Sequence, residues 1–257
     1  MPLNKIFISI QTIVTKEVNR FMRIWIQTLL APVITTALYF IIFGGFIGSQ
    51  VKPLNGFSYM QFIVPGLVMM AIINGSFQST VSTFFQAKMM KNLEELLVSP
   101  TPHWAIVLGF VLGGVARGVL LGAIVLLCAA FFVPIVVHNL FLLVLFGVLT
   151  SAIFAIAGLI NAVYAKGFDG ISIIPTFVLT PLTYLGGVFY SVKLLPHLWQ
   201  TVSFFNPIVY MINGFRYGLL GVSDASIGAS LFVLLGTTTG LTIWTLYLFK
   251  SGKGMQM

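Results

Sequence analysis

The chain has 257 residues, of which 58% are hydrophobic and 7% are charged. A soluble domain carries about 25% charged residues. Thirteen bases and five acids cannot cover a water-facing surface on a chain of this length. The composition therefore excludes a soluble globular domain and predicts an integral membrane protein whose apolar side chains face lipid.

The stretches without charged residues predict the membrane-spanning segments. A spanning helix needs about 20 apolar residues, and the sequence contains six segments suited to that role. We therefore expect an all-α bundle that forms a single transmembrane domain over residues 1–257. The expected spans are 25–47, 58–84, 105–133, 140–164, 172–191 and 226–249.

The basic residues are divided unequally between the two sides of the membrane that six spans define. Lys52 and Lys193 fall on one side, with Arg216 near its interface, and nine bases fall on the side of the termini. Basic loops stay in the cytoplasm, so we expect cytoplasmic termini and a multi-pass protein of the inner membrane. Bases scattered along membrane flanks do not form a nucleic-acid patch. The nine bases are Lys5, Lys16, Arg20, Arg23, Lys88, Lys91, Lys166, Lys250 and Lys253.

Two further helices are expected on the cytoplasmic side. In residues 4–24, apolar side chains recur at helical spacing and the charged ones fall mostly elsewhere, which is typical of a helix lying along the headgroup boundary. Residues 88–99 predict a short amphipathic helix that Ser99 and Pro100 end. This helix is either a solvated loop or a docking surface for another protein. We favour docking, with the candidate contacts Lys91, Glu94, Glu95 and Leu96.

Arg117 lies inside the third expected span, among glycines whose GxxxG spacing favours close helix packing. It is about 18 Å along the helix from a start near Ala105. An ionised side chain at that depth marks a functional site by default, and no acid is expected within the bilayer to pair with it. Arg117 could line a pathway, where water or an anionic substrate meets it, or it could fix the structure by contacting backbone carbonyls.

Aromatic residues gather near the outer ends of two spans. Tyr39, Phe43 and Phe46 share a helical face in span one, and Tyr184, Phe189 and Tyr190 lie in the outer half of span five. They form either an interfacial aromatic belt or a stacking surface for a sugar or an amphipathic substrate.

Prolines interrupt the same two spans. Pro32, Pro175 and Pro181 each remove a backbone hydrogen bond, so they are candidate kinks that could act as hinges. Residues 194–218 are apolar but are broken by Pro196 and by Asn206-Pro207. Because the pieces are too short to span, we expect short re-entrant helices at the outer mouth of a pathway.

Motifs for self-contained chemistry are missing from the sequence. There is no G-x-x-x-x-G-K-[ST] phosphate loop, so this chain is not expected to hydrolyse ATP by that route. The three histidines lack metal-ligand spacing, and Cys128 is the sole cysteine. We therefore expect no catalytic residues, no metal site and no cofactor bound by this chain, and we interpret Cys128 as a small core residue.

The segments NLEELLVSP (92–100) and PLTYLGGVFYSVKLLPHLWQTVSFFNPIVYMINGFRYGLLG (181–221), with six spans and the N-terminal helix, resemble the type-2 ABC transporter permease family over essentially the whole chain. The resemblance implies a membrane subunit of a bacterial exporter that pairs with a copy of itself and with two ATP-binding subunits, which would bind ATP and Mg²⁺. It further implies that the helix with Glu94 and Glu95 couples to the ATPase and that residues 4–24 form the connecting helix.

Two other readings of the sequence remain open. One is a self-sufficient channel or ion-coupled carrier with Arg117 lining the pore. The other is a membrane-embedded enzyme or a scaffold without transport activity. No residue selects among drugs, polysaccharides and lipid-linked compounds as the substrate.

Overall fold

The computed structural model describes residues 2–48, 50, 53, 54, 56–252 and 254. Lys52 and Lys253, two of the bases used to predict the orientation, lie outside the described residues. Within the described part, six helical segments are long and apolar enough to cross a membrane. The predicted all-α membrane protein with six spans is therefore confirmed. The six segments are Ile26–Phe46, Tyr59–Met89, His103–Ala130, Leu140–Tyr164, Phe168–Leu185 and Ile227–Ser251.

The N-terminal part of the chain is one helix followed by a composite span. Helix α1 ends at Arg23, and the span after it alternates between π-helical and α-helical turns. Pro32 is the second residue of the first α-helical part, directly after π-helical turns. The elements are α1 (Leu3–Arg23), η1 (Ile26–Leu30), α2 (Ala31–Tyr39) and η2 (Phe40–Ile47).

Helix α3 (Tyr59–Met89) is the centre of the bundle and packs against α5 (His103–Ala130), α6 (Leu140–Tyr164) and α10 (Pro207–Leu220). In its most apolar stretch 78% of the residues are buried, against 17% in the first, fifth and sixth spans. The outer spans therefore leave faces that lipid or another chain must cover.

The central helices approach closely where glycines face backbone. A Cβ on Gly158 of α6 would lie 2.6 Å from the carbonyl oxygen of Phe77 in α3. Nearby, the hydroxyl oxygens of Ser76 and Ser151 lie 2.7 Å apart and form a hydrogen bond between the same two helices. Small residues and hydrogen bonds between helices are the contacts that hold helices together in lipid, where the hydrophobic effect contributes little.

The remaining elements are short helices and the last span. The fifth span is composite, with α-helical, π-helical and α-helical parts, and Pro175 and Pro181 stand at the first and second positions of two of those parts. The elements are α4 (Asn92–Val98), α7 (Phe168–Ile174), η3 (Pro175–Leu179), α8 (Thr180–Leu185), η4 (Val192–Leu194), α9 (His197–Phe204) and α11 (Ile227–Ser251).

Residues 194–218 contain two helices that are too short to cross a bilayer, α9 with 8 residues and α10 with 14. Asn206 separates them, because its side chain accepts a hydrogen bond from the amide of Ile208 and caps α10. The division into short helices follows the breaks seen in the sequence. Their re-entrant position in a membrane stays a prediction.

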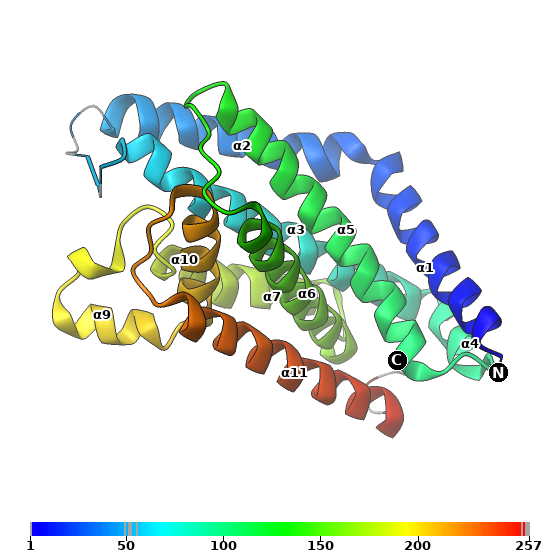
Figure 1. The fold of residues 1–257 in the computed structure, drawn as a ribbon. Helices are drawn as coiled ribbons and strands as arrows, with labels where there is room; N and C mark the ends of the chain where they lie inside the picture. Colours follow the sequence, from blue (N-terminus) through cyan, green and yellow to red (C-terminus); the bar gives the residue numbers. More distant parts are fainter. Residues whose placement is uncertain (1, 49, 51–52, 55, 253, 255–257) are drawn as a thin grey trace.

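The start of α1, the short helix α4 and the last turns of α11 lie at the same end of the bundle, and α9 lies at the opposite end (Figure 1). The rings of Phe84 and Phe249, whose centroids are 5.7 Å apart, join the corresponding ends of α3 and α11. An even number of spans produces this arrangement. Which end faces the cytoplasm stays a prediction.

Two spans end well away from their expected positions. The second span continues to Met89 because Lys88, expected in the following loop helix, donates hydrogen bonds to the carbonyls of Val163 (2.8 Å) and Ala165 (3.2 Å) at the end of α6. The fifth span covers 168–185 instead of 172–191. It ends early because Gly187, with φ of +78°, turns the chain away from the helix.

Candidate functional site

A row of polar side chains runs along an open face of α3. Asn74, Gln78, Ser82 and Gln86 follow one another at intervals of four residues, which places them on one side of the helix. Gln78 and Gln86 are exposed and the other two are half-buried, whereas most other residues of α3 are buried. We call these four residues the polar row. The sequence analysis missed it, although the spacing of four within an uncharged stretch was visible there.

Arg117 lies beside this row and lines a cavity of about 190 Å³ between α2, α3 and α5. Its Nη2 atom donates to the carbonyl oxygen of Thr28 at 3.5 Å, and its Nε is buried without a hydrogen-bond partner. The carbonyl contact expected of a structural role is present, a cavity lies beside the guanidinium, and the pathway role stays a prediction. The cavity is lined by Pro32, Thr35, Thr36, Tyr39, Leu67, Met70, Ala71, Asn74, Gly75, Gln78, Arg117 and Leu121.

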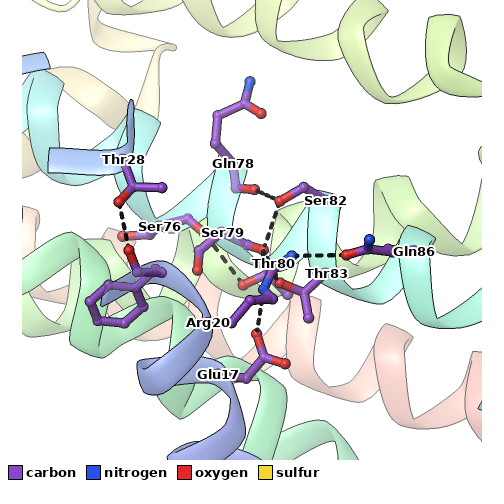
Figure 2. A network of polar contacts seen from close by, with 11 residues as sticks. Glu17, Arg20, Thr28, Ser76, Gln78, Ser79, Thr80, Ser82, Thr83 and Gln86 are labelled. Atoms are coloured by element: carbon purple, nitrogen blue, oxygen red, sulfur yellow. Dashed lines mark hydrogen bonds and ion pairs between the residues drawn. The ribbon is translucent and has the colours of Figure 1, made fainter. Parts of the chain in front are cut away.

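Arg20 joins α1 to α3 beside Gln86, the last residue of the polar row (Figure 2). Its guanidinium donates to the hydroxyl of Thr83, to the side-chain oxygen of Gln86 at 3.3 Å and to the carbonyl of Ser79 at 3.3 Å. Its Nε lies 3.8 Å from a carboxylate oxygen of Glu17. One base therefore connects the N-terminal helix with the central helix.

Glu17 is buried, so the expectation that the charged residues of α1 lie away from its packed face is wrong for this residue. Glu17 shares a face of α1 with Ile13 and Phe21, and this face packs on α5. A Cβ added to Gly113 of α5 would lie only 2.6 Å from the Cβ of Glu17. Burial raises the pKa of the Glu17 carboxyl, and Arg20 opposes that rise. Burial likewise lowers the pKa of Arg20, which Glu17 opposes. The close approach at a glycine explains how a glutamate fits in this interface.

The short helix after α3 is smaller than expected. It was predicted over 88–99, but α3 continues to Met89 and α4 covers only Asn92–Val98. The break falls at Lys91, whose positive φ of 60° is unusual for a residue with a side chain. Leu93 is buried, Leu96 is half-buried, and Glu94 and Glu95 are exposed. Helix α4 therefore presents two adjacent carboxylates at one end of the bundle.

The structure brings the aromatic residues of the first and fifth spans together. The rings of Phe43 and Phe189 stack at a centroid distance of 4.7 Å, and Phe189 also contacts Tyr39 and Tyr184, each at 5.8 Å. The hydroxyl oxygens of Tyr39 and Tyr184 lie 3.3 Å apart. Tyr190 is half-buried on the turn that follows. Tyr39 also lines the Arg117 cavity, so the aromatic group and that cavity are adjacent.

Arg216 is fully buried inside the protein, and its expected position near the outer interface of the membrane stays a prediction. It donates to the carbonyl of Gly187 at 2.6 Å, and its Nη1 lies 3.9 Å from the carboxylate of Asp224. That carboxylate accepts hydrogen bonds from the Ser191 hydroxyl at 2.8 Å and the Val192 amide at 2.9 Å. The pair joins α10 to the turn after the fifth span and to the loop before α11. The sequence did not indicate this ion pair.

A search of the described residues finds no group of three or more His, Cys, Asp or Glu side chains suited to a metal ion. The features that remain are an open polar row, a cavity with an arginine and an exposed acidic helix. In a bundle of six spans, these features define a membrane protein that carries polar and charged side chains on surfaces its own helices leave open.

Comparison with known proteins places this class in a family. Residues 8–220 match the model of the ABC-2 type transporter family, and the chain belongs to that family. It is 52% identical over 250 residues to the inner membrane transport permease YadH of Escherichia coli, covering 97% of this chain and 98% of the relative. It is 26% identical over 197 residues to nodulation protein J of Sinorhizobium fredii, covering 72% and 70% of the two chains. The chain is a multi-pass permease of the inner membrane.

Proposed function

We propose that two copies of this chain form the substrate pathway of an ATP-binding-cassette exporter. Two separate ATP-binding subunits, which hold ATP and Mg²⁺, drive it from the end of the bundle where α4 lies. Membership of the ABC-2 type transporter family and the permease relative support this assignment.

The polar row of α3 is the observation that carries the proposal. The amides of Gln78 and Gln86 are exposed on a spanning helix, and within the described part of the chain only the oxygen of Gln86 has a partner, the guanidinium of Arg20. An unsatisfied polar group in lipid costs roughly several kcal/mol. Lipid is therefore a poor neighbour for this face. A second copy that packs around the open face would enclose the row in a water-filled pathway.

Helix α4 supplies the contact with the energy source. Leu93 anchors it to the bundle, while Glu94 and Glu95 project from it. An exposed acidic helix at the end of a bundle can pair with bases of another chain, and such complementary charges favour specific association. Because α4 follows α3 directly, movement of the docked subunit would act on the helix that carries the polar row.

The coupling assignment is tested on the complex of the tagged permease with the ATP-binding subunit that co-purifies with it. The double variant Glu94→Ala, Glu95→Ala should lower the ATPase activity that the permease stimulates, and Lys166→Ala, an exposed base at the same end, should not. If the double variant keeps full activity, α4 is not the coupling element. Transport by the permease alone without nucleotide would favour the channel or carrier instead.

The pathway assignment is tested by labelling with a water-soluble thiol reagent in a Cys128→Ser background. Gln78→Cys should react, whereas Leu112→Cys, on an exposed apolar position of α5, should stay unlabelled in lipid. Equal labelling of the two positions would remove the polar row from the pathway.

A further inference from the structure

We propose that the Arg117 cavity binds an anionic group, a phosphate or a carboxylate, of the transported molecule. The transported molecule would then be an amphipathic anion, because apolar side chains line the same cavity. This inference rests on the proposed transport function and names the chemistry that its pathway selects.

The first argument is an unbalanced charge. The ion pairs among the described residues are Glu17–Arg20 and Arg216–Asp224, so Arg117 has no acid within ion-pair distance. Arg117 is 14 residues from the start of α5, about 21 Å along the helix. An isolated charge at that depth is costly unless water or a counter-ion meets it. A bound anion would supply the missing negative charge.

The chain cannot provide that charge itself. It has five acids, of which two form ion pairs with other arginines and three are exposed in short helices or first turns at the ends of spans. The five acids are Glu17, Asp224, Glu94, Glu95 and Asp169.

The second argument is the geometry of the cavity. Its volume of about 190 Å³ exceeds the roughly 150 Å³ of a cavity that accommodates benzene. The guanidinium makes one long hydrogen bond, and its buried Nε has none. Asn74 donates to the carbonyl of Met70 at 2.9 Å and the Thr35 hydroxyl donates to the carbonyl of Ala31 at 3.1 Å, so these two donors are occupied. The Arg117 guanidinium and the exposed amide of Gln78 are the donors available for an acceptor-rich group.

The third argument is the apolar part of the wall. Leu67, Met70, Ala71 and Leu121 line the cavity beside the arginine. Tyr39 leads from the cavity to the aromatic group around Phe189. A molecule with one anionic end and an apolar or aromatic remainder would use both surfaces, whereas an inorganic ion would use only the guanidinium.

The test measures ligand-dependent thermal stability of the purified full-length permease in a neutral detergent. The probes are dioleoylphosphatidylglycerol, dioleoylphosphatidylcholine and inorganic phosphate. We expect the phosphatidylglycerol to raise the melting temperature and the phosphatidylcholine, which carries no net charge, to have little effect. Stabilisation by inorganic phosphate through Arg117 would support the anion site and identify a free anion as a sufficient ligand. Equal stabilisation by the two lipids would overturn the proposal.

Matched variants assign the effect to the cavity. Arg117→Gln should weaken the apparent affinity for phosphatidylglycerol by about tenfold or more, because it removes a charge-assisted contact. Arg117→Lys should keep part of it, and Lys193→Gln, an exposed base elsewhere, should change nothing. Met70→Trp keeps the charge of Arg117 but fills the cavity, so it should abolish binding of phosphatidylglycerol. This variant tests the site independently if Arg117→Gln folds poorly.

A permease in which Met70→Trp and a folded Arg117→Gln both retain the lipid-dependent shift would overturn the assignment of the anion to this cavity. The measurement needs neither ATP nor the partner subunit. Its failure is therefore distinguishable from failure of the proposed function, which is read from the effect of the α4 substitutions on ATPase activity.

Discussion

The guanidinium carbon of Arg216 lies 4.1 Å from the centroid of the Phe62 ring, so a base of α10 is stacked on the central helix α3. A cation over an aromatic face is attracted by the ring electrons, and more strongly when water is excluded. With the Asp224 ion pair and the Gly187 carbonyl, this contact joins four segments of the chain at the end opposite to α4.

We predict that Arg216→Met destabilises the protein by about 3–5 kcal/mol, because it leaves the buried Asp224 carboxylate without its counter-charge. Thermal or denaturant unfolding in detergent measures this loss, with Lys193→Met as the control for removing a nearby exposed base. The double variant Arg216→Met, Asp224→Asn should recover part of the stability. Unfolding of Arg216→Met at the wild-type midpoint would contradict a structural role for the pair.

Glu17 makes the stability of the α1–α3 contact depend on pH. Because burial raises the pKa of Glu17, this carboxyl binds a proton more readily in the folded protein than in the unfolded chain. The stability contributed by Glu17 is therefore fully present below its ordinary pKa of 4.5 and is lost as the pH rises through the higher folded value. The stability of the wild type relative to Glu17→Gln should fall across that window, measured by unfolding at several pH values. Ser9→Ala, an uncharged exposed change on α1, is the control, and parallel curves for wild type and Glu17→Gln would refute the prediction.

Gly158 is required for the close approach of α6 to α3. In Gly158→Ala the new methyl carbon would lie 2.6 Å from the Phe77 carbonyl oxygen, and backbone cannot move aside as a side chain can. We expect a loss of about 1–3 kcal/mol. Gly240→Ala on α11, where no atom lies within 4 Å of the new carbon, should leave stability unchanged or increase it by up to about 1 kcal/mol. Equal effects of the two changes, measured by thermal unfolding, would contradict this packing argument.

Phe43 and Phe189 should be energetically coupled, since their rings stack although the residues belong to distant parts of the chain. A double-mutant cycle with Phe43→Leu and Phe189→Leu is expected to give a coupling energy of about 0.5–1.5 kcal/mol. The same cycle for Phe43 and Phe177, which is exposed on the π-helical part of the fifth span, is the control. A coupling energy of zero for the first pair would mean that the first span and the turn after the fifth span separate in detergent.

The class of protein and the number of spans followed from the sequence because they depend on composition and on the length of apolar stretches. These are properties of consecutive residues, and a bilayer of fixed thickness responds to them directly. The prolines were likewise visible in the sequence as places where the helical hydrogen bonding must change. Pro32, Pro175 and Pro181 stand where α-helical and π-helical parts of the spans meet, because a proline alters hydrogen bonding wherever it lies.

The sequence also indicated individual residues of interest, but it could not predict which side chains or cavities they contact. Arg117, Tyr39 and Tyr184 were recognisable as unusual or clustered, but the cavity beside Arg117 and the contact between the two tyrosines depend on how three helices pack. The polar row was readable as a spacing of four. Its open position on α3 was not, because every other face of that helix is covered by helices distant in sequence.

Tertiary structure alone decided the partners of the buried charges. Glu17 and Arg216 belong to residue types that normally face water. The local pattern placed the charged residues of α1 mostly off its apolar face and Arg216 near the membrane interface, and it did not show that either residue is buried. Each is buried because one specific neighbour, Arg20 or Asp224, neutralises it and because the surrounding backbone leaves room for it. Such compensation is a property of pairs in space. A one-dimensional pattern records the chemistry of each member but not the distance between them.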